Sequence, residues 1–132
     1  MPFDEPAFLS LDYLHFDFAE GSDGTGSLEA MASTWPEQVP AVHAEVVQVL
    51  AWAHAEFAGR RGPLDEGFAW DYDLHGMREL TAPEALLYDE AAGRLTVQPG
   101  PPGKARHTLT LSLSGTAEFC DAFQREFGLD PG

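Results

Sequence analysis

The chain has 132 residues, the length of one ordinary domain, and 44% of them are apolar, which argues against a disordered chain. It carries 22 acidic and 7 basic residues, so its formal net charge is −15. Such a charge repels phosphate backbones and anionic lipids, which argues against direct nucleic-acid binding and against membrane binding. The first 59 residues contain no Lys or Arg, so a basic protein is the kind of partner that this charge would attract.

Residue usage favours a cytoplasmic bacterial protein. The chain has one cysteine, Cys120, which fits a reducing compartment, and its first residues lack the basic start and apolar run of a secretory signal. No apolar stretch approaches the roughly 20 residues of a membrane span. The chain has no Ile, no Asn and a single Lys. The codons of these residues are AT-rich, and their scarcity favours a GC-rich genome.

The beginning of the chain predicts a hairpin. Residues 20–26 are rich in Gly and Asp and predict a turn, and residues 27–35 predict a strand that pairs back. The strand before the turn is predicted over residues 13–18. There Leu14, Phe16 and Phe18 alternate with His15 and Asp17, which is typical of a half-buried strand.

A long helix is predicted over residues 37–58, with Pro36 and Pro40 at its start and Gly59 as its C-terminal cap. One side of this helix carries apolar residues at helical spacing, namely Val39, Val42, Val46, Leu50, Ala53 and Phe57, and the neighbouring Val47, Ala51 and His54 widen this stripe.

The opposite side of the same helix carries Glu45, Gln48 and Trp52, and the helix has no basic residue. Tryptophan is enriched at protein interfaces, and symmetric dimers are the commonest oligomers. We therefore expect a homodimer whose interface includes these three residues. The alternative is that Trp52 packs within its own chain.

The second half of the chain predicts four strands and a final helix. Residues 68–74 alternate strongly, and Gly76 marks a bulge or the end of pairing. Residues 85–89 and 95–98 predict a hairpin with Gly93 in the left-handed conformation. Residues 106–114 alternate again. Thr116 then caps a helix whose apolar stripe is Phe119, Cys120, Phe123 and Phe127.

The predicted order of elements is β-β-α-β-β-β-β-α. Short turns between successive strands favour antiparallel pairing, and strands with one apolar face favour helices on that face alone. We therefore expect a single α+β domain over residues 1–132, with a single, mostly antiparallel sheet and two helices packed on one face.

The sequence contains no motif that assigns a cofactor, a metal ligand or a catalytic residue, and we expect no cofactor. The glycines of residues 21–26 and 100–103 do not have the spacing of phosphate-binding loops. His43 and His54 lie eleven positions apart on one helix, about 16 Å, which is too far to share a metal. Cys120 lies between Phe119 and Phe123, so we expect it to be buried.

The strongest candidate for a ligand site lies on the polar face of the sheet. One strand carries His15 and Asp17, and another carries Asp71, Asp73 and His75. Side chains at i and i+2 lie on the same face of a strand. If the two strands are neighbours, these groups form a cluster suited to a divalent cation or to acid–base chemistry. The alternative is an ordinary solvated face.

Three classes of function remain open. The first, which we prefer because it requires the fewest assumptions, is a non-enzymatic interaction or accessory protein that forms a homodimer or binds a basic protein. The second is a small ligand-binding or metal-binding protein, or an enzyme, that uses the His/Asp face. The third is an acidic mimic of nucleic acid. Sequence alone does not decide whether the protein is an enzyme.

Overall fold

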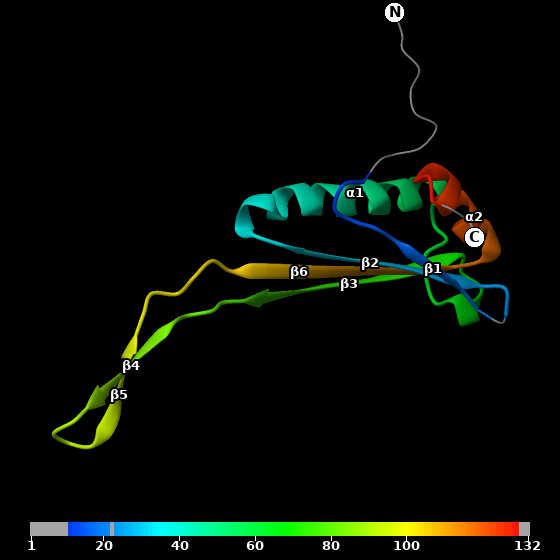
Figure 1. Cartoon of the computed structure of the whole chain (residues 1–132). Coiled ribbons are helices and arrows are strands. Elements are labelled where there is room, and N and C mark those ends of the chain that lie inside the picture. Colours follow the sequence, from blue (N-terminus) through cyan, green and yellow to red (C-terminus); the bar gives the residue numbers. More distant parts are fainter. Residues whose placement is uncertain (1–10, 22, 130–132) are drawn as a thin grey trace, which may run out of the picture.

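The order of elements along the chain is the predicted one (Figure 1). The structure is a computed structural model that describes residues 11–21 and 23–129. Short 3-10 turns precede α1 and β3, at Pro36–Gln38 and Leu64–Glu66. The strands and helices are β1 (Asp17–Glu20), β2 (Gly26–Thr34), α1 (Val39–Glu56), β3 (Trp70–Glu79), β4 (Glu84–Asp89), β5 (Arg94–Pro99), β6 (Arg106–Gly115) and α2 (Ala117–Glu126).

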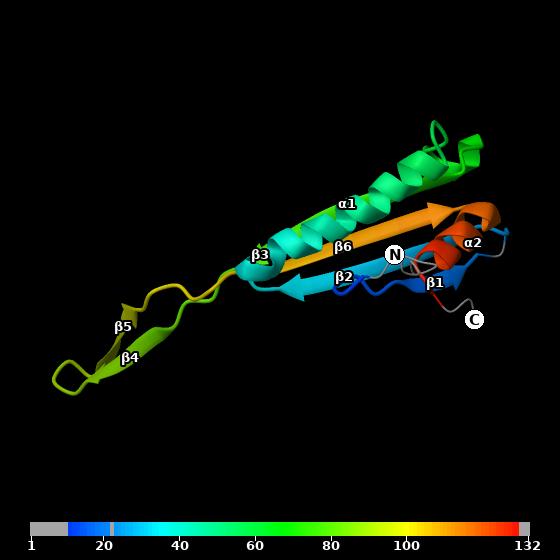
Figure 2. The ribbon, with the colours of Figure 1, turned by 90° about the horizontal axis from the view of Figure 1, so that it is seen from above.

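The main sheet has four antiparallel strands in the order β1-β2-β6-β3. Both helices lie side by side over one face of it (Figures 1 and 2). The predicted α+β class, with antiparallel strands and two helices on one face, is therefore confirmed. Over the range that the structure describes, neither helix has the length and apolar character needed to cross a lipid bilayer.

The sheet differs from the prediction in one respect, because β4 and β5 form a separate two-stranded ribbon. We call this ribbon the arm. It projects from the end of the body formed by the main sheet and helices (Figures 1 and 2). Gly100 N–H donates to the Pro83 carbonyl at 2.8 Å and Gly103 N–H to the Thr81 carbonyl at 2.6 Å. The two segments that lead into and out of the arm are thus hydrogen-bonded to each other between the sheet and the arm. The regular ladder stops because residues 99–102 include three prolines, which have no N–H to donate.

The core lies between the sheet and the helices. Along β2 the residues alternate strictly between buried and exposed, and in β6 the buried Leu111 and Leu113 pair in register with Ala30 and Leu28. The alternation of residues 106–114 predicts the buried face of β6 correctly, whereas for residues 27–35 the sequence predicts only a strand that pairs back. Thr116 caps α2 as predicted, since its Oγ1 accepts a bond from Phe119 N–H at 3.3 Å. The predicted stripe of α2 is buried, namely Phe119, Cys120, Phe123 and Phe127.

Helix α1 is rotated relative to the predicted stripe. Its buried residues are Val42, Val46, Val49 and Ala53, whereas Val47 is 64% exposed. The predicted members Val42, Val46, Ala53 and Phe57 are thus correct. The widening of the stripe by Val47, Ala51 and His54 is wrong, because all three are exposed. The reason is that α1 has two neighbours. The sheet lies beneath it and α2 lies beside it, so the buried face turns toward Val49 and Trp52.

Candidate functional site

The structure divides the predicted His/Asp cluster between the two edges of the sheet. Strand β1, with Asp17, and strand β3, with Asp71, Asp73 and His75, are separated by β2 and β6. At about 4.8 Å per strand, the two edges lie roughly 14 Å apart. His15 is exposed and precedes β1. The condition for a five-residue cluster, that the two strands are neighbours, is therefore not met.

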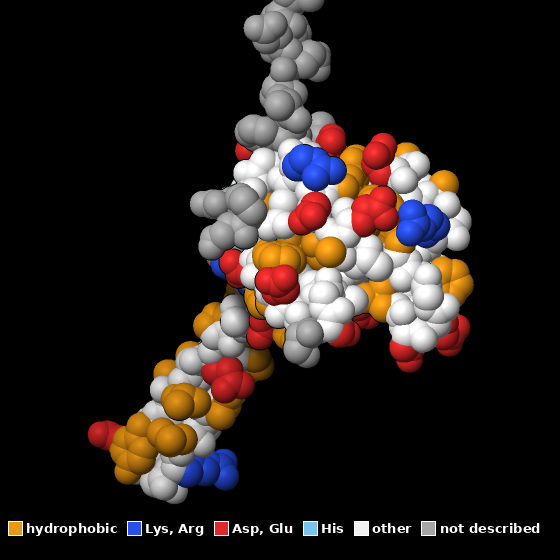
Figure 3. All heavy atoms as spheres, turned by 90° about the vertical axis from the view of Figure 1, so that its right-hand side faces the viewer, with side chains coloured by type: hydrophobic (Ala, Val, Ile, Leu, Met, Phe, Trp, Pro, Cys, Tyr) orange, Lys and Arg blue, Asp and Glu red, His pale blue; other side chains and the backbone are white. Residues whose placement is uncertain are grey.

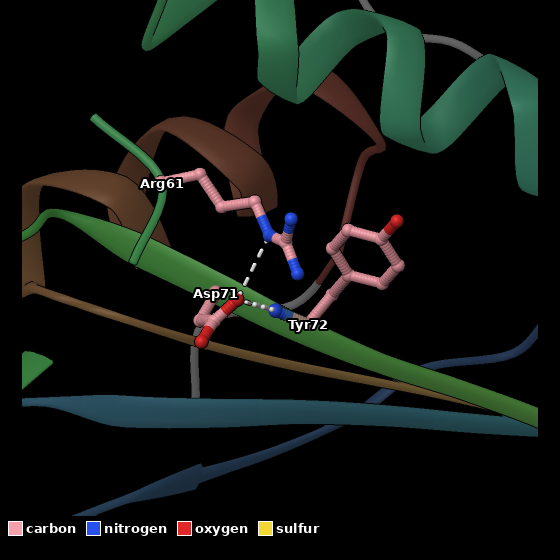
Figure 4. Close-up of polar contacts among 3 residues, drawn as sticks. All are labelled: Arg61, Asp71 and Tyr72. Atoms are coloured by element: carbon pink, nitrogen blue, oxygen red, sulfur yellow. Dashed lines mark hydrogen bonds and ion pairs between the residues drawn. The ribbon is translucent and has the colours of Figure 1, made fainter. Parts of the chain in front are cut away.

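Asp71 has a structural partner (Figure 4). Its Oδ1 accepts a bond from Arg61 Nε at 2.9 Å and another from the Tyr72 backbone N–H at 2.9 Å. The guanidinium carbon of Arg61 lies 4.4 Å from the centre of the Tyr72 ring, a cation–π distance. Asp71 and Tyr72 together hold the loop that connects α1 to β3 against the edge of the sheet.

Asp73 and His75 form a separate pair on the solvent side of β3. His75 Nδ1 lies 3.3 Å from Asp73 Oδ2, and both side chains are largely exposed. An exposed pair of this kind contributes little stability. A depression of about 270 Å³ is lined by Asp71 and Asp73 but not by His15 or His75. Within residues 11–21 and 23–129, no group of three or more His, Cys, Asp or Glu side chains is arranged to hold a metal ion.

The residues predicted to form an interface on α1 make contacts within the chain. Trp52 is half-buried, and its ring lies 5.6 to 6.2 Å from four phenylalanine rings of the same chain. These are Phe57, Phe119, Phe123 and Phe127. The packing of Trp52 within its own chain, the alternative stated above, accounts for its position. The structure therefore removes the observation on which the α1 interface rested.

Glu45 also has a role inside the chain. Its carboxylate accepts the backbone N–H groups of Asp12 at 2.7 Å, Tyr13 at 3.0 Å and Leu14 at 3.0 Å. It fastens the segment before β1 to the helix, with Leu14 buried beneath. Gln48, one turn further along α1, is partly exposed.

The arm is a candidate functional surface that the sequence analysis does not single out. The register of β4 and β5 pairs Leu86 with Val97 and Tyr88 with Leu95, so these four side chains share one face of the ribbon. They are 59%, 55%, 66% and 60% exposed, respectively. Figure 3 shows the apolar side chains gathered along the arm. The sequence does predict the hairpin of residues 85–98. Its alternating apolar residues also predict that one face packs against the rest of the protein, but no described residue covers that face.

Cys120 is buried, as predicted. It is 2% exposed, and its Sγ lies 3.7 Å from the Gly115 carbonyl. Burial, followed by the nearby charge of Asp121, raises the pKa of the thiol to about 11. A thiol with such a pKa is a poor nucleophile at neutral pH, so Cys120 belongs to the core and not to a reactive site.

Comparison with protein-family models, with curated proteins and with solved structures gave no match.

Proposed function

We propose that this protein is a non-enzymatic interaction domain that forms a homodimer through its arm. In this dimer, the face made by Leu86, Tyr88, Leu95 and Val97 packs against the same face of a second copy. The observation that carries the proposal is that all four side chains are more than half exposed on one side of a ribbon that the rest of the described chain leaves uncovered.

A binding partner would stabilise the arm. A two-stranded ribbon alone is marginally stable in water, and it needs further strands or a packing surface to bury its apolar face. Together the four side chains expose roughly 400 Å². The largest apolar patch on a typical monomer has about this area, and such patches are often functional. Soluble proteins seldom carry such a patch at the end of a projecting element without a use for it.

The charge of the chain favours a second copy at this face over any other face. Two copies at −15 each repel one another wherever their acids meet. Within β4 and β5, Glu84 at the base of the arm is the one charged residue on this side of the ribbon. Copies therefore approach there at a small electrostatic cost. A two-fold dimer uses the same patch on both copies, and two stacked ribbons at about 10 Å give an ordinary face-to-face packing.

The size of this contact predicts a weak dimer. It buries about 800 Å² in total, roughly half the area of a standard stable interface. The dimer should strengthen as salt is added, because ions screen the repulsion between the two acidic bodies. Binding to a basic partner through charge would show the opposite dependence on salt.

The test is the mass of the protein in solution, measured by sedimentation over about a hundredfold range of concentration. The wild type should move from monomer to dimer. The double variant Leu86→Ser and Tyr88→Ser should stay monomeric. The variant Leu87→Ser, which alters the opposite face of the same strand, should dimerise like the wild type. A wild type that is monomeric throughout, or a Leu87→Ser variant as defective as the double variant, overturns the proposal.

A basic protein partner is the second candidate, and the open face of the sheet favours it. The register of the strands places Glu29, Asp71 and Asp73 on the face of the sheet opposite α1 and α2. A lysine-rich peptide should then shift the amide resonances of β2 and β3 in nuclear magnetic resonance, and these shifts should disappear as salt is added. Unchanged resonances would exclude this second function and leave the homodimer untouched.

A further inference from the structure

A cavity of about 220 Å³ lies where the start of α1 passes over β3 and β6, close to the base of the arm. Its apolar wall includes Val42 of α1 and Leu109 of β6, and Gly76 of β3, the register partner of Leu109, also lines it. A Cβ placed on Gly76 would meet only the Thr108 carbonyl oxygen, at 3.5 Å. The missing side chain of this glycine therefore leaves the space open.

The polar rim of the cavity is unusual for this protein because it is basic. Besides Thr34 and Thr108, its polar lining is His43 of α1, Arg78 of β3 and His107 of β6, and the last two are direct register partners. An arginine and two imidazoles thus converge on one opening in a chain whose acids outnumber its bases by 22 to 7.

Arg78 is the residue that gives this rim its chemistry. It makes no ion pair with any residue in the part of the chain that the structure describes, although acids are abundant. The bases around it behave differently. Lys104 pairs with Glu37 at 2.6 Å, and Arg106 lies over the Trp35 ring and donates to Ser33. The guanidinium of Arg78 is left available for a ligand, and its planar fork matches a carboxylate.

We infer that this cavity binds a small organic carboxylate with an apolar tail. Arg78 takes the carboxylate, His43 and His107 supply further hydrogen bonds, and the tail lies against Val42 and Leu109 above Gly76. A cavity of roughly 150 Å³ holds a benzene molecule, so this one suits a ligand of about eight non-hydrogen atoms. The inference uses none of the residues of the arm, so it stands or falls separately from the proposed dimer.

Hexanoate, with eight non-hydrogen atoms, is the probe for this site, and binding is followed by nuclear magnetic resonance titration of the full chain. The amides of Gly76, Arg78 and Leu109 and the methyl groups of Val42 should shift together. Hexan-1-ol, with the same tail and no charge, should bind at least about tenfold more weakly, because it forfeits the charge-assisted bonds to Arg78. Inorganic phosphate, an anion without a tail, should also bind more weakly.

Two variants locate the site. Gly76→Val should fill the cavity and abolish hexanoate binding in a protein that stays folded, since valine is favoured in strands and the space is free. Arg78→Gln should weaken hexanoate at least about tenfold and leave hexan-1-ol unchanged. Arg94→Gln removes the same charge from the arm and should bind hexanoate normally.

Several results would overturn the inference. They are no shift with any probe, equal binding of hexanoate and hexan-1-ol, tighter binding of phosphate than of hexanoate, or full hexanoate binding by the Gly76→Val variant. Because the mass of the protein is measured independently, the dimer can fail while this site is confirmed, and the reverse also holds.

Discussion

Gly26 of β2 and Gly115 of β6 are direct register partners, and both are buried beneath α2. A Cβ on Gly26 would lie 2.7 Å from Phe18, and a Cβ on Gly115 would lie well within the normal contact distance of the Phe119 ring and clash with it. Because neither glycine has a side chain, the rings of Phe18 and Phe119 pack directly against the backbone at this end of the sheet. This close approach sets the distance between α2 and the sheet.

The first prediction follows from that close approach. Gly115→Ala should lower the free energy of unfolding by about 2 to 3 kcal/mol, because the added methyl group forces Phe119 out of its packed position. Gly76→Ala, the same substitution in the neighbouring strand β3, should change stability by less than about 1 kcal/mol, because its Cβ meets only an ordinary contact. Urea unfolding of the two variants measures the difference, and equal effects would contradict the close packing.

Glu45 carries the second prediction. Glu45→Ala should cost about 1 to 3 kcal/mol of stability, because three backbone N–H groups lose a charged acceptor. Amide hydrogen exchange at Tyr13 and Leu14 should become faster. Glu56→Ala, at the exposed far end of the same helix, should leave both measurements unchanged and serves as the control. Slow exchange at Leu14 in the Glu45→Ala variant would show that burial alone holds this segment.

Cys120 allows a prediction on reactivity and pH. Its folded-state pKa of about 11 lies above the ordinary value of 9.0, so the native state keeps the thiol protonated while the unfolded state ionises. This group therefore favours folding below pH 9, and its contribution is lost as the pH rises toward about 11. A thiol reagent at neutral pH should label the native protein only at the rate of unfolding. Rapid labelling without denaturant would be inconsistent with a buried thiol.

Glu37 and Lys104 give a prediction on the pKa of an exposed carboxylate. The hydrogen bond from Lys104 Nζ holds the pKa of Glu37 below its ordinary value. Because the folded-state pKa is lowered, this contact stabilises the protein above the ordinary pKa of glutamate and loses that effect as the pH falls through the folded value. Lys104→Met should raise the pKa of Glu37 in a titration followed by nuclear magnetic resonance. An unchanged pKa would mean that the contact does not persist in solution.

Local patterns in the sequence predicted most of the elements. Alternation of residues 106–114 predicts β6, and the Gly/Asp-rich turn predicts that β2 pairs back on β1. The Thr116 cap and the phenylalanine spacing predict α2, and Gly93 has the positive φ expected in the hairpin turn. The stripe of α1 was only partly correct, because spacing along a helix does not reveal a second neighbour at its side. Trp52 faces that neighbour, so helical spacing alone places it on the polar side of α1.

The candidate sites depend on relationships between distant segments, which local patterns do not contain. Asp17 and Asp73 are separated because β6 inserts between β2 and β3, a pairing that joins opposite ends of the chain. The arm leaves the sheet because three prolines in residues 99–102 interrupt the ladder. The cavity arises only where the glycine at position 76 comes to lie beneath α1. The prolines, the glycine and the acidic residues are visible in the sequence, but their positions relative to one another depend on how the strands are ordered in the sheet.

The central place of β6 has a consequence for synthesis of the protein on the ribosome. Leu28 of β2 pairs with Leu113 of β6, so the sheet cannot close until almost the whole described chain has been made. Until then the nascent chain carries β2, α1 and β3 with their apolar faces unpaired, and contacts so distant in sequence form slowly. The first 59 residues carry acidic side chains and no Lys or Arg. Their negative charge would make neighbouring nascent chains on the same messenger RNA repel one another during that interval.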